Sequence, residues 1–265
     1  MIIVSYNIRG GGSRLKRKRI GYMIQKEGVD VCFIQESKLR MVEVGVVKEF
    51  WGNDSVEWYS MDVVGASGGM LILWRKDLFT PVFSFRGLGF IGLCVSMNGS
   101  TIFFINVYAP CDLAARRRSW DQLLELKKAH PGGNWCVGGY FNSIAHEEER
   151  RGISNRSFVN EVNYFKGFIE ELDLVDPPVV GGKFTWQNSS GKAMSKIDRF
   201  LISESLLVEW NVGAQEIGGR DLSDHAPIWI KDNKKKLGTK TVQIQQYLVE
   251  AQRVHPFCRE GVAVD

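Results

Sequence analysis

The sequence has few cysteines, and they lack the spacing of a disulfide framework or a metal site. Its five cysteines form no Cys-x-x-Cys pair and no cluster with histidine. An odd number of cysteines without a framework argues for a reducing compartment. Cys32 and Cys94 lie inside apolar runs, which predicts that both are small buried hydrophobic residues.

Long apolar runs are also absent. No segment approaches the roughly 20 apolar residues that are needed to span a bilayer. The N-terminus begins Met1-Ile2-Ile3-Val4, without the charged region that opens a signal peptide. No internal repeat is visible, and no linker occurs before about residue 231. These absences predict a soluble intracellular protein.

What remains is an ordinary globular composition with a basic excess. The 265 residues are 44% hydrophobic and 24% charged, which fits one large α/β domain or two small ones. The formal net charge is +4, and basic residues cluster at 14–19, 116–118 and 234–236. Clustering suits a polyanionic partner, because each neutralised phosphate releases counterions. A solvated face is the more common explanation of such a charge run.

Short apolar runs alternate with longer amphipathic stretches. Helical spacing of apolar residues predicts helices over residues 14–27, 113–128 and 158–172. Apolar runs predict strands over residues 2–6, 31–34, 69–74, 90–97, 101–108, 134–138, 196–202 and 226–230. Asn98-Gly99 is a strong hairpin signal between two of these strands. Hairpins mixed with crossover helices indicate an α/β sandwich that contains antiparallel sheet.

Polar residues recur at the ends of these strands and in the late segments: Asn7, Gln35-Glu36, Tyr108, Asn142, Asp198 and Ser223-Asp224-His225. We place Asn142 just after a turn at Gly138-Gly139. Strand ends that project into a crevice are where α/β proteins usually place their sites. Taken singly, each residue has a common structural explanation: an Asn after a strand is often a turn former, and Asp198 with His225 could be a structural pair.

Seven ordered motifs contain these residues: Ser5-Tyr6-Asn7, Ile34-Gln35-Glu36-Ser37, Ser67-Gly68-Gly69, Asn106-Val107-Tyr108-Ala109-Pro110, Gly138-Gly139-Tyr140-Phe141-Asn142, Lys196-Ile197-Asp198-Arg199-Phe200 and Ser223-Asp224-His225-Ala226-Pro227. Together they resemble the endonuclease/exonuclease/phosphatase superfamily, which includes DNase I and the apurinic/apyrimidinic endonucleases. The segments 184–188 and 194–199 resemble in particular the endonuclease domain of plant LINE-type (non-LTR) retrotransposons.

The resemblance implies a fold and a domain plan. The fold is an α/β, four-layered sandwich of the DNase I type, with two central mixed β-sheets flanked by helices and the site at their edge. We expect one endonuclease/exonuclease/phosphatase domain over residues 1–230 and a basic, weakly structured tail over 231–265. The implied partner is DNA, with no membrane and no obligate protein partner. The basic run at 14–19 and the family's substrate suggest a nuclear location.

The resemblance also implies roles for single residues. Glu36 would ligate Mg²⁺ or Mn²⁺, with Asn7 and Asp224 supporting the metal site, because carboxylate and amide oxygens suit a hard cation. His225, oriented and kept protonated by Asp198, would stabilise or protonate phosphoryl oxygens.

Four further positions would contact the substrate. Tyr108 and Asn142 would hydrogen-bond the phosphate, while Ser67, in the Ser67-Gly68-Gly69 turn, and Trp186 would shape the groove. All of these roles are carried over from the family's motifs.

Residue 140 departs from the family pattern, which has Gly-Asp-Phe-Asn where this chain has Gly139-Tyr140-Phe141-Asn142. The missing aspartate orients and deprotonates the attacking water. A phenol, with a reference pKa of about 10, is a poor base at neutral pH, and its ring occupies more space. The expected function is therefore a divalent-metal-dependent phosphodiesterase that nicks DNA and is impaired by Tyr140. The alternatives are an inactive nucleic-acid-binding relic of that domain, or a phosphatase of the same superfamily.

Two other departures concern Arg9 and the end of the chain. Some relatives carry an acidic residue where this sequence has Arg9, and we interpret Ile8-Arg9-Gly10 as variation within the retrotransposon branch. No reverse transcriptase follows the domain in this sequence.

Overall fold

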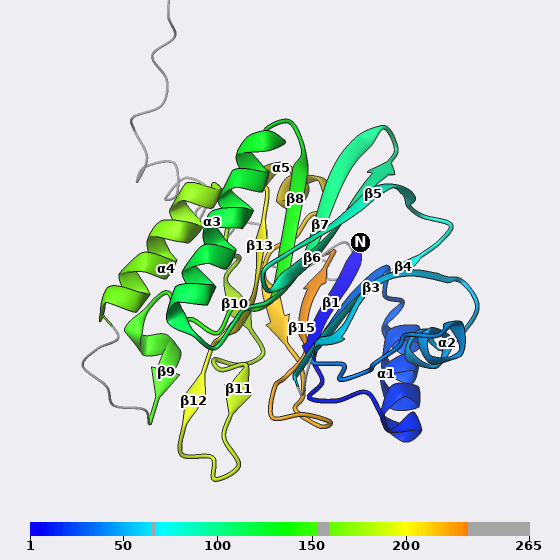
Figure 1. The fold of residues 1–265 in the computed structure, drawn as a ribbon, viewed down its shortest axis with the longest axis horizontal. Helices are drawn as coiled ribbons and strands as arrows, with labels where there is room; N and C mark the ends of the chain where they lie inside the picture. Colours follow the sequence, from blue (N-terminus) through cyan, green and yellow to red (C-terminus); the bar gives the residue numbers. More distant parts are fainter. Residues whose placement is uncertain (65–66, 153–158, 233–265) are drawn as a thin grey trace, which may run out of the picture.

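The computed structural model describes residues 1–64, 67–152 and 159–232. Two large β-sheets lie face to face in its centre, with helices α3 (Leu113–Ala129) and α4 (Val159–Leu172) outside one of them. Helices α1 (Arg14–Glu27) and α2 (Val44–Trp51) lie outside the other (Figure 1). The predicted four-layered α/β sandwich is therefore confirmed.

The first sheet has seven strands, in the order β10 (Val179–Val180), β14 (Gln215–Ile217), β15 (Ile228–Lys231), β1 (Ile2–Asn7), β2 (Val31–Gln35), β4 (Ser67–Arg75) and β3 (Val56–Val64). The second has five, in the order β13 (Asp198–Ile202), β8 (Asn134–Tyr140), β7 (Ser100–Tyr108), β6 (Phe90–Met97) and β5 (Thr80–Gly87). Both sheets are mixed, since β1 pairs with β2 and β7 with β8 in parallel. The carboxyl ends of these four strands meet at one edge of the molecule, at the bottom in Figure 1.

Smaller elements complete the fold. The two-residue strands β11 (Trp186–Gln187), β12 (Met194–Ser195) and β9 (Arg150–Arg151) form a third sheet. Helix α5 (Glu204–Glu209) and the short helix η1 (Glu147–Glu149) lie in connections. Two of the long helices begin at a side-chain cap, since Ser13 accepts from the backbone NH of Lys16 and Asp112 from that of Ala115. Such caps typically stabilise a helix by about 1 kcal/mol.

Three hydrophobic cores separate the four layers. The core between the sheets includes Phe33 and Phe104, whose rings meet edge to face with centroids 6.3 Å apart. The core under α3 and α4 is built around Trp120, and the core under α1 and α2 includes Phe50 and Trp51. Close packing on both faces explains why the central strands are mostly apolar and do not alternate between apolar and polar residues.

The structure corrects the sequence-based interpretation of Gly138-Gly139. Both glycines lie inside β8, which continues to Tyr140, so they do not form a turn. Gly139 has a φ of +139°, and a Cβ there would lie 2.1 Å from the carbonyl oxygen of Val107. Only glycine fits at this position, because the backbone of the parallel strand β7 approaches so closely.

Other predicted boundaries hold to within a few residues. Cys32 and Cys94 are buried, as predicted. Ten elements were missed, most of them short: α2, β3, β5, η1, β9, β10, β11, β12, α5 and β14. Lys231, the first residue of the predicted tail, belongs to β15, where it pairs with Ile2. The rest of the predicted tail, from residue 233, lies outside the described residues.

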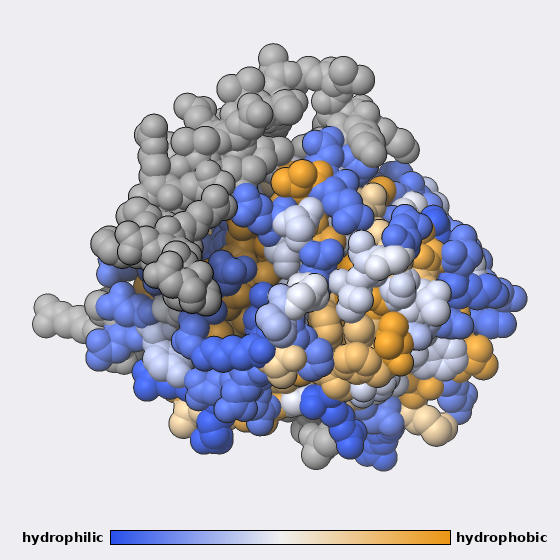
Figure 2. Space-filling model, turned by 90° about the horizontal axis from the view of Figure 1, so that it is seen from above, coloured by the Kyte–Doolittle hydropathy of each residue, from blue (hydrophilic) through white to orange (hydrophobic). Residues whose placement is uncertain are grey.

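Figure 2 views the molecule from above, at the end opposite the meeting strand ends, where hydrophilic residues surround a smaller group of hydrophobic ones. None of the helices within residues 1–64, 67–152 and 159–232 is long and apolar enough to cross a membrane.

Candidate active site

The four parallel strand ends bring the predicted polar residues together. Asn7 ends β1 opposite Gln35 of β2, and Glu36 follows directly. Tyr108 ends β7 opposite Tyr140, the last residue of β8. Residues that lie up to 133 positions apart in the sequence thus share one edge, because each strand is in register with its parallel neighbour.

Asp198 and His225 form a buried pair behind Tyr140. Nδ1 of His225 lies 2.8 Å from Oδ2 of Asp198, and both residues are only 3% exposed. Burial alone would lower the pKa of His225, but the charge and hydrogen bond of Asp198 outweigh it and raise that pKa. The pair therefore favours a protonated imidazole that can donate from Nε2, as the resemblance implied.

The ring of Tyr140 lies among the site's other aromatic groups. Its centroid is 5.6 Å from that of Tyr108 and 5.3 Å from the imidazole of His225, which it meets edge to face. Burial, with the neighbouring Asp198 carboxylate, raises the pKa of Tyr140 far above its ordinary value of 10. The phenol is neutral at physiological pH and cannot accept a proton from water.

Tyr108 is similarly held in its neutral form. Burial raises the pKa of its phenol, and the Glu36 carboxylate, with which it shares a hydrogen bond, raises it further. A neutral phenol that donates to an anionic oxygen suits the predicted role of Tyr108 in binding a phosphate oxygen.

The two carboxylates of the site, Glu36 and Asp224, contact one arginine. Nη1 of Arg9 donates to Oδ2 of Asp224, and its Nε lies 3.9 Å from Oε2 of Glu36. Nζ of Lys38 is 3.5 Å from the same Glu36 oxygen. Partial burial would raise the pKa of Asp224, but the hydrogen bond from Arg9 and the nearby His225 outweigh it and hold that pKa below its ordinary value.

The predicted metal ligands provide the right kind of donor for a hard cation. Glu36 and Asp224 supply carboxylates, and Asn7 supplies a buried amide whose Nδ2 has no hydrogen-bond partner among the described residues. No group of three or more His, Cys, Asp or Glu side chains within residues 1–64, 67–152 and 159–232 is arranged to hold a metal. The donor set fits a Mg²⁺ or Mn²⁺ ion that keeps several waters.

A buried amide network that sequence reasoning missed lies beneath these ligands. Nε2 of Gln35 donates to Oδ1 of Asn106 at 2.6 Å and to Ser5 at 2.9 Å. Nδ2 of Asn106 donates to the backbone oxygens of Ile34 and Leu71, both at 2.9 Å. This network joins the two sheets directly below the site and fixes the start of the Glu36 segment.

A second buried network fixes the strand that carries Asp198. Arg199 is fully buried, and its Nη2 donates to Oε2 of Glu149 at 2.7 Å. Lys196 pairs with the same Glu149 and with Asp176, at 3.2 and 3.1 Å. The basic residues of the motif around Asp198 are therefore structural, and they hold the start of β13 against the η1 segment.

Asn142 lies in the loop after β8, half-buried and with a φ of +54°. Its backbone oxygen accepts from Nη1 of Arg116 at 2.9 Å, and Arg116 also pairs with Glu161 of α4. Arg116 is buried, so its charge is not available to a polyanionic partner. It was missed as a support of Asn142 because only the fold brings the two together.

The basic run at 14–19 is largely paired within the molecule. Arg14 and Arg17 both donate to Glu49, Lys16 donates to the backbone oxygen of Ile8, and Arg19 pairs with Asp221. Arg14 and Arg17 thus hold α1 against α2, and Lys16 holds the start of the loop that carries Arg9. The charge of the run is consequently less available to a polyanion than the sequence suggested.

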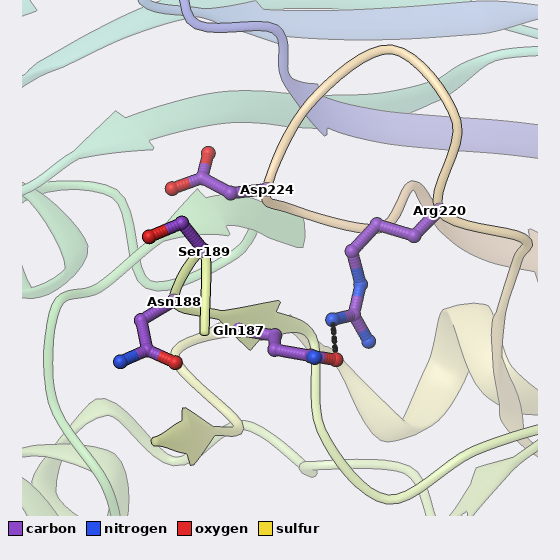
Figure 3. A pocket seen from close by; sticks show the side chains of 5 residues that line it. All are labelled: Gln187, Asn188, Ser189, Arg220 and Asp224. Atoms are coloured by element: carbon purple, nitrogen blue, oxygen red, sulfur yellow. Dashed lines mark hydrogen bonds between the residues drawn. The ribbon is translucent and has the colours of Figure 1, made fainter. Parts of the chain in front are cut away.

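An open pocket lies beside the carboxylates, lined by Gln187, Asn188, Ser189, Arg220 and Asp224 (Figure 3). Arg220 donates to the Gln187 side chain across it, as the dashed line shows. Trp186 donates from Nε1 to Oδ2 of Asp224 at 2.9 Å, so this predicted groove residue contacts a predicted metal ligand. The side chain of Ser67 lies outside the described part of the chain, and its role stays a prediction.

Comparison with known proteins identifies the family of this chain. The model of the endonuclease/exonuclease/phosphatase family matches residues 4–225, most of the chain. The chain belongs to this family. Membership of this family supports hydrolase activity for the chain.

Solved structures share the family fold at low sequence identity. The 3'-5' exonuclease NExo from Neisseria meningitidis is 18% identical, with a TM-score of 0.68 over 88% of this chain and 99% of that one. The AP endonuclease LMAP from Leishmania major is 15% identical, with a TM-score of 0.68 over 86% of each chain.

A third similar structure is the endonuclease domain of TRAS1, a telomere-specific non-LTR retrotransposon. It is 15% identical, with a TM-score of 0.64 over 89% of this chain and 99% of that one. A search of curated proteins finds no matching sequence. At these identities the structural likeness establishes the fold, while the chemistry of this chain has to be argued from its own residues.

Proposed function

We propose that this protein is a divalent-metal-dependent DNA-nicking phosphodiesterase of the retrotransposon-endonuclease type whose hydrolysis is strongly reduced by Tyr140. Family membership supports phosphate-ester hydrolysis. The buried His225–Asp198 pair, at 2.8 Å, supports the same chemistry, because it retains a proton donor beside a neutral phosphate-binding tyrosine.

The observation that carries the proposal is the place of Tyr140. Its ring occupies the end of β8 between Tyr108 and His225, where the family motif has a carboxylate. Among the described residues, the nearest candidates do not replace this base, since the neighbouring Tyr108 is also neutral and Asp198 is engaged with His225. Loss of a general base typically lowers a rate by about 10²- to 10⁴-fold.

The remaining side chains have distinct roles in this proposal. Protonated His225 donates to a non-bridging phosphoryl oxygen, and the charge of Asp198 keeps it protonated. Tyr108 and Asn142 donate to phosphate oxygens and orient the phosphodiester. A divalent cation held by Glu36, Asp224 and the amide of Asn7 would supply polarisation of a phosphoryl oxygen.

Restoring the carboxylate tests this proposal. The Tyr140→Asp protein should convert supercoiled plasmid to the nicked form with Mg²⁺ or Mn²⁺. The same substitution combined with Glu36→Ala should not, because the metal ligand is gone. A folded Tyr140→Asp protein that binds DNA but never nicks it contradicts the proposal.

A second candidate function is a DNA-binding domain without hydrolysis, and the contacts of Arg9 favour it. One guanidinium already contacts both Glu36 and Asp224. Under this alternative, a folded Tyr140→Asp protein binds duplex DNA at low salt and stays inert with either metal. Nicking by the unmodified chain excludes the alternative, whereas nicking by Tyr140→Asp alone shows only that Arg9 does not block the restored site.

A further inference from the structure

Arg9 contacts the residues that are proposed to bind the metal ion, although it is itself a cation. It follows β1 in the left-handed region, with a φ of +48°, and its backbone NH donates to Oδ1 of Asn7 at 3.2 Å. Its guanidinium then extends over both carboxylates, donating to Asp224 and lying 3.9 Å from Glu36. Arg9 therefore engages all three proposed metal ligands, two through its side chain and one through its backbone.

A guanidinium in this position offers the carboxylates what a divalent cation would offer. It is positively charged at every physiological pH and binds carboxylate oxygens through several donors. The Oδ2 atom of Asp224 that it occupies also accepts from Trp186, so that oxygen already has two donors. Little acceptor capacity is left there for a metal ion while Arg9 stays in place.

We propose that Arg9 is a built-in counter-cation that competes with the divalent metal for Glu36 and Asp224, so that metal binding requires displacement of its guanidinium. The proposal rests on the proposed function in taking these two carboxylates as metal ligands. It identifies Arg9 as a residue that determines metal affinity, independently of whether Tyr140 allows hydrolysis.

Displacement is sterically open. The Arg9 side chain is 51% exposed, whereas those of Glu36 and Asp224 are 13% and 23% exposed. The carboxylates are thus fixed at the edge of the sheet while the guanidinium can turn into solvent. Lys38, 3.5 Å from Glu36, is a second cation at the same mouth and adds to the repulsion of an incoming ion.

The strength of the competition follows from this partial exposure. An arginine–carboxylate contact near water is worth much less than a buried one, but here one arginine must leave two carboxylates together. Removing the guanidinium should therefore tighten metal binding by about tenfold near 0.1 M salt. A larger effect is expected at lower salt, because screening is weaker.

Mn²⁺ binding without DNA tests the proposal, measured from the electron paramagnetic resonance of free Mn²⁺. The variant is Arg9→Met, which keeps the length of the side chain and adds no oxygen ligand. The control is Arg14→Met, which changes the net charge equally but removes an exposed arginine that pairs with Glu49. Thermal unfolding of each variant verifies that the fold is retained.

The expected result is Mn²⁺ binding about tenfold tighter for Arg9→Met than for the unmodified chain, with Arg14→Met within about twofold of it. Adding Glu36→Gln to Arg9→Met should abolish the gain, because the metal binds at Glu36. Three results overturn the proposal: equal affinity with and without Arg9, an equal gain in Arg14→Met, or no Mn²⁺ binding to Arg9→Met. Nicking by Tyr140→Asp is measured separately, so either idea can fail alone.

Discussion

At the scale of single residues, the site combines retained and altered chemistry within a few ångströms. The His225–Asp198 pair and the neutral Tyr108 can each donate a hydrogen bond to an anionic oxygen. Tyr140 and Arg9 alter the charges of the site. Tyr140 places a neutral ring where the family motif has a carboxylate. Arg9 contacts the carboxylates of Glu36 and Asp224. Under the proposed function, these two changes lower hydrolysis more than they lower phosphate binding.

The titration of His225 gives a pH-dependent prediction. Its pKa is higher in the folded protein than the ordinary 6.5, so the protonated form stabilises the fold. That contribution is fully present below about pH 6.5 and is lost as the pH rises through the folded-state pKa. The free energy of unfolding should therefore differ more between the unmodified chain and His225→Gln at pH 6 than at pH 9.

Urea denaturation at the two pH values measures this difference. Asp198→Asn should lower the His225 pKa, which a titration of the imidazole resonances by nuclear magnetic resonance would report. A gap in unfolding free energy that stays constant or widens from pH 6 to pH 9 contradicts the assignment of a protonated His225.

At the scale of secondary-structure elements, α3 fixes the loop that follows β8. Arg116 of α3 reaches both the Asn142 backbone oxygen and the Glu161 carboxylate of α4. Arg116→Met should lower the free energy of unfolding by about 2–4 kcal/mol, because it leaves a mostly buried Glu161 without its partner.

The matched control is Arg118→Met on the same helix, where the side chain is exposed and the expected loss is below about 0.5 kcal/mol. Chemical denaturation of both variants measures the two losses in the free energy of unfolding. Equal losses would show that Arg116 is an ordinary surface arginine.

The strands that could be predicted from the sequence are those buried on both faces. β2 and β7 read as continuous apolar runs because each lies between two hydrophobic cores. β5 was missed because nearly all of its residues are exposed at the edge of its sheet, so its sequence carries no burial pattern. α2 was missed because its eight residues include Gly45 and several β-branched valines, which favour helix weakly.

The same contrast applies to the site. The ordered motifs placed Asn7, Glu36 and Tyr108 at strand ends, because those positions follow directly from where each apolar run stops. The contacts of Arg9 with Asp224 could not be read from the chain, since the two lie 215 positions apart and meet only when β1 and the segment before β15 share an edge. Contacts between loops depend on the closed sandwich and have no local sequence pattern.

At the scale of the whole molecule, most basic residues of the run at 14–19 are paired internally. The net charge is only +4, and Arg14, Arg17 and Arg19 each hold a carboxylate of their own chain. Duplex DNA should therefore bind weakly, and because only a few phosphate contacts form near the site, the salt dependence of its affinity should be shallow.

Arg220 is the cation expected to make one of these contacts, because it lines the pocket beside Asp224 (Figure 3). Arg220→Met should weaken binding to all duplex sequences alike and reduce the salt slope of log K by about 1. Fluorescence anisotropy with a short duplex measures this slope. Lys76→Met, at the far end of β4, is the control and should leave it unchanged. An unchanged slope in Arg220→Met would place the DNA elsewhere.

The central claim is that the residue at position 140 limits hydrolysis because it is not a base. The most direct test compares the nicking rate constants, at saturating Mn²⁺, of the unmodified chain, Tyr140→Asp and Tyr140→Asn. Asparagine removes the ring without supplying a carboxylate, so it separates bulk from basicity. We expect Tyr140→Asp to nick about 10²- to 10⁴-fold faster than the other two. Equal rates for Tyr140→Asp and Tyr140→Asn, or for Tyr140→Asp and the unmodified chain, would contradict the account.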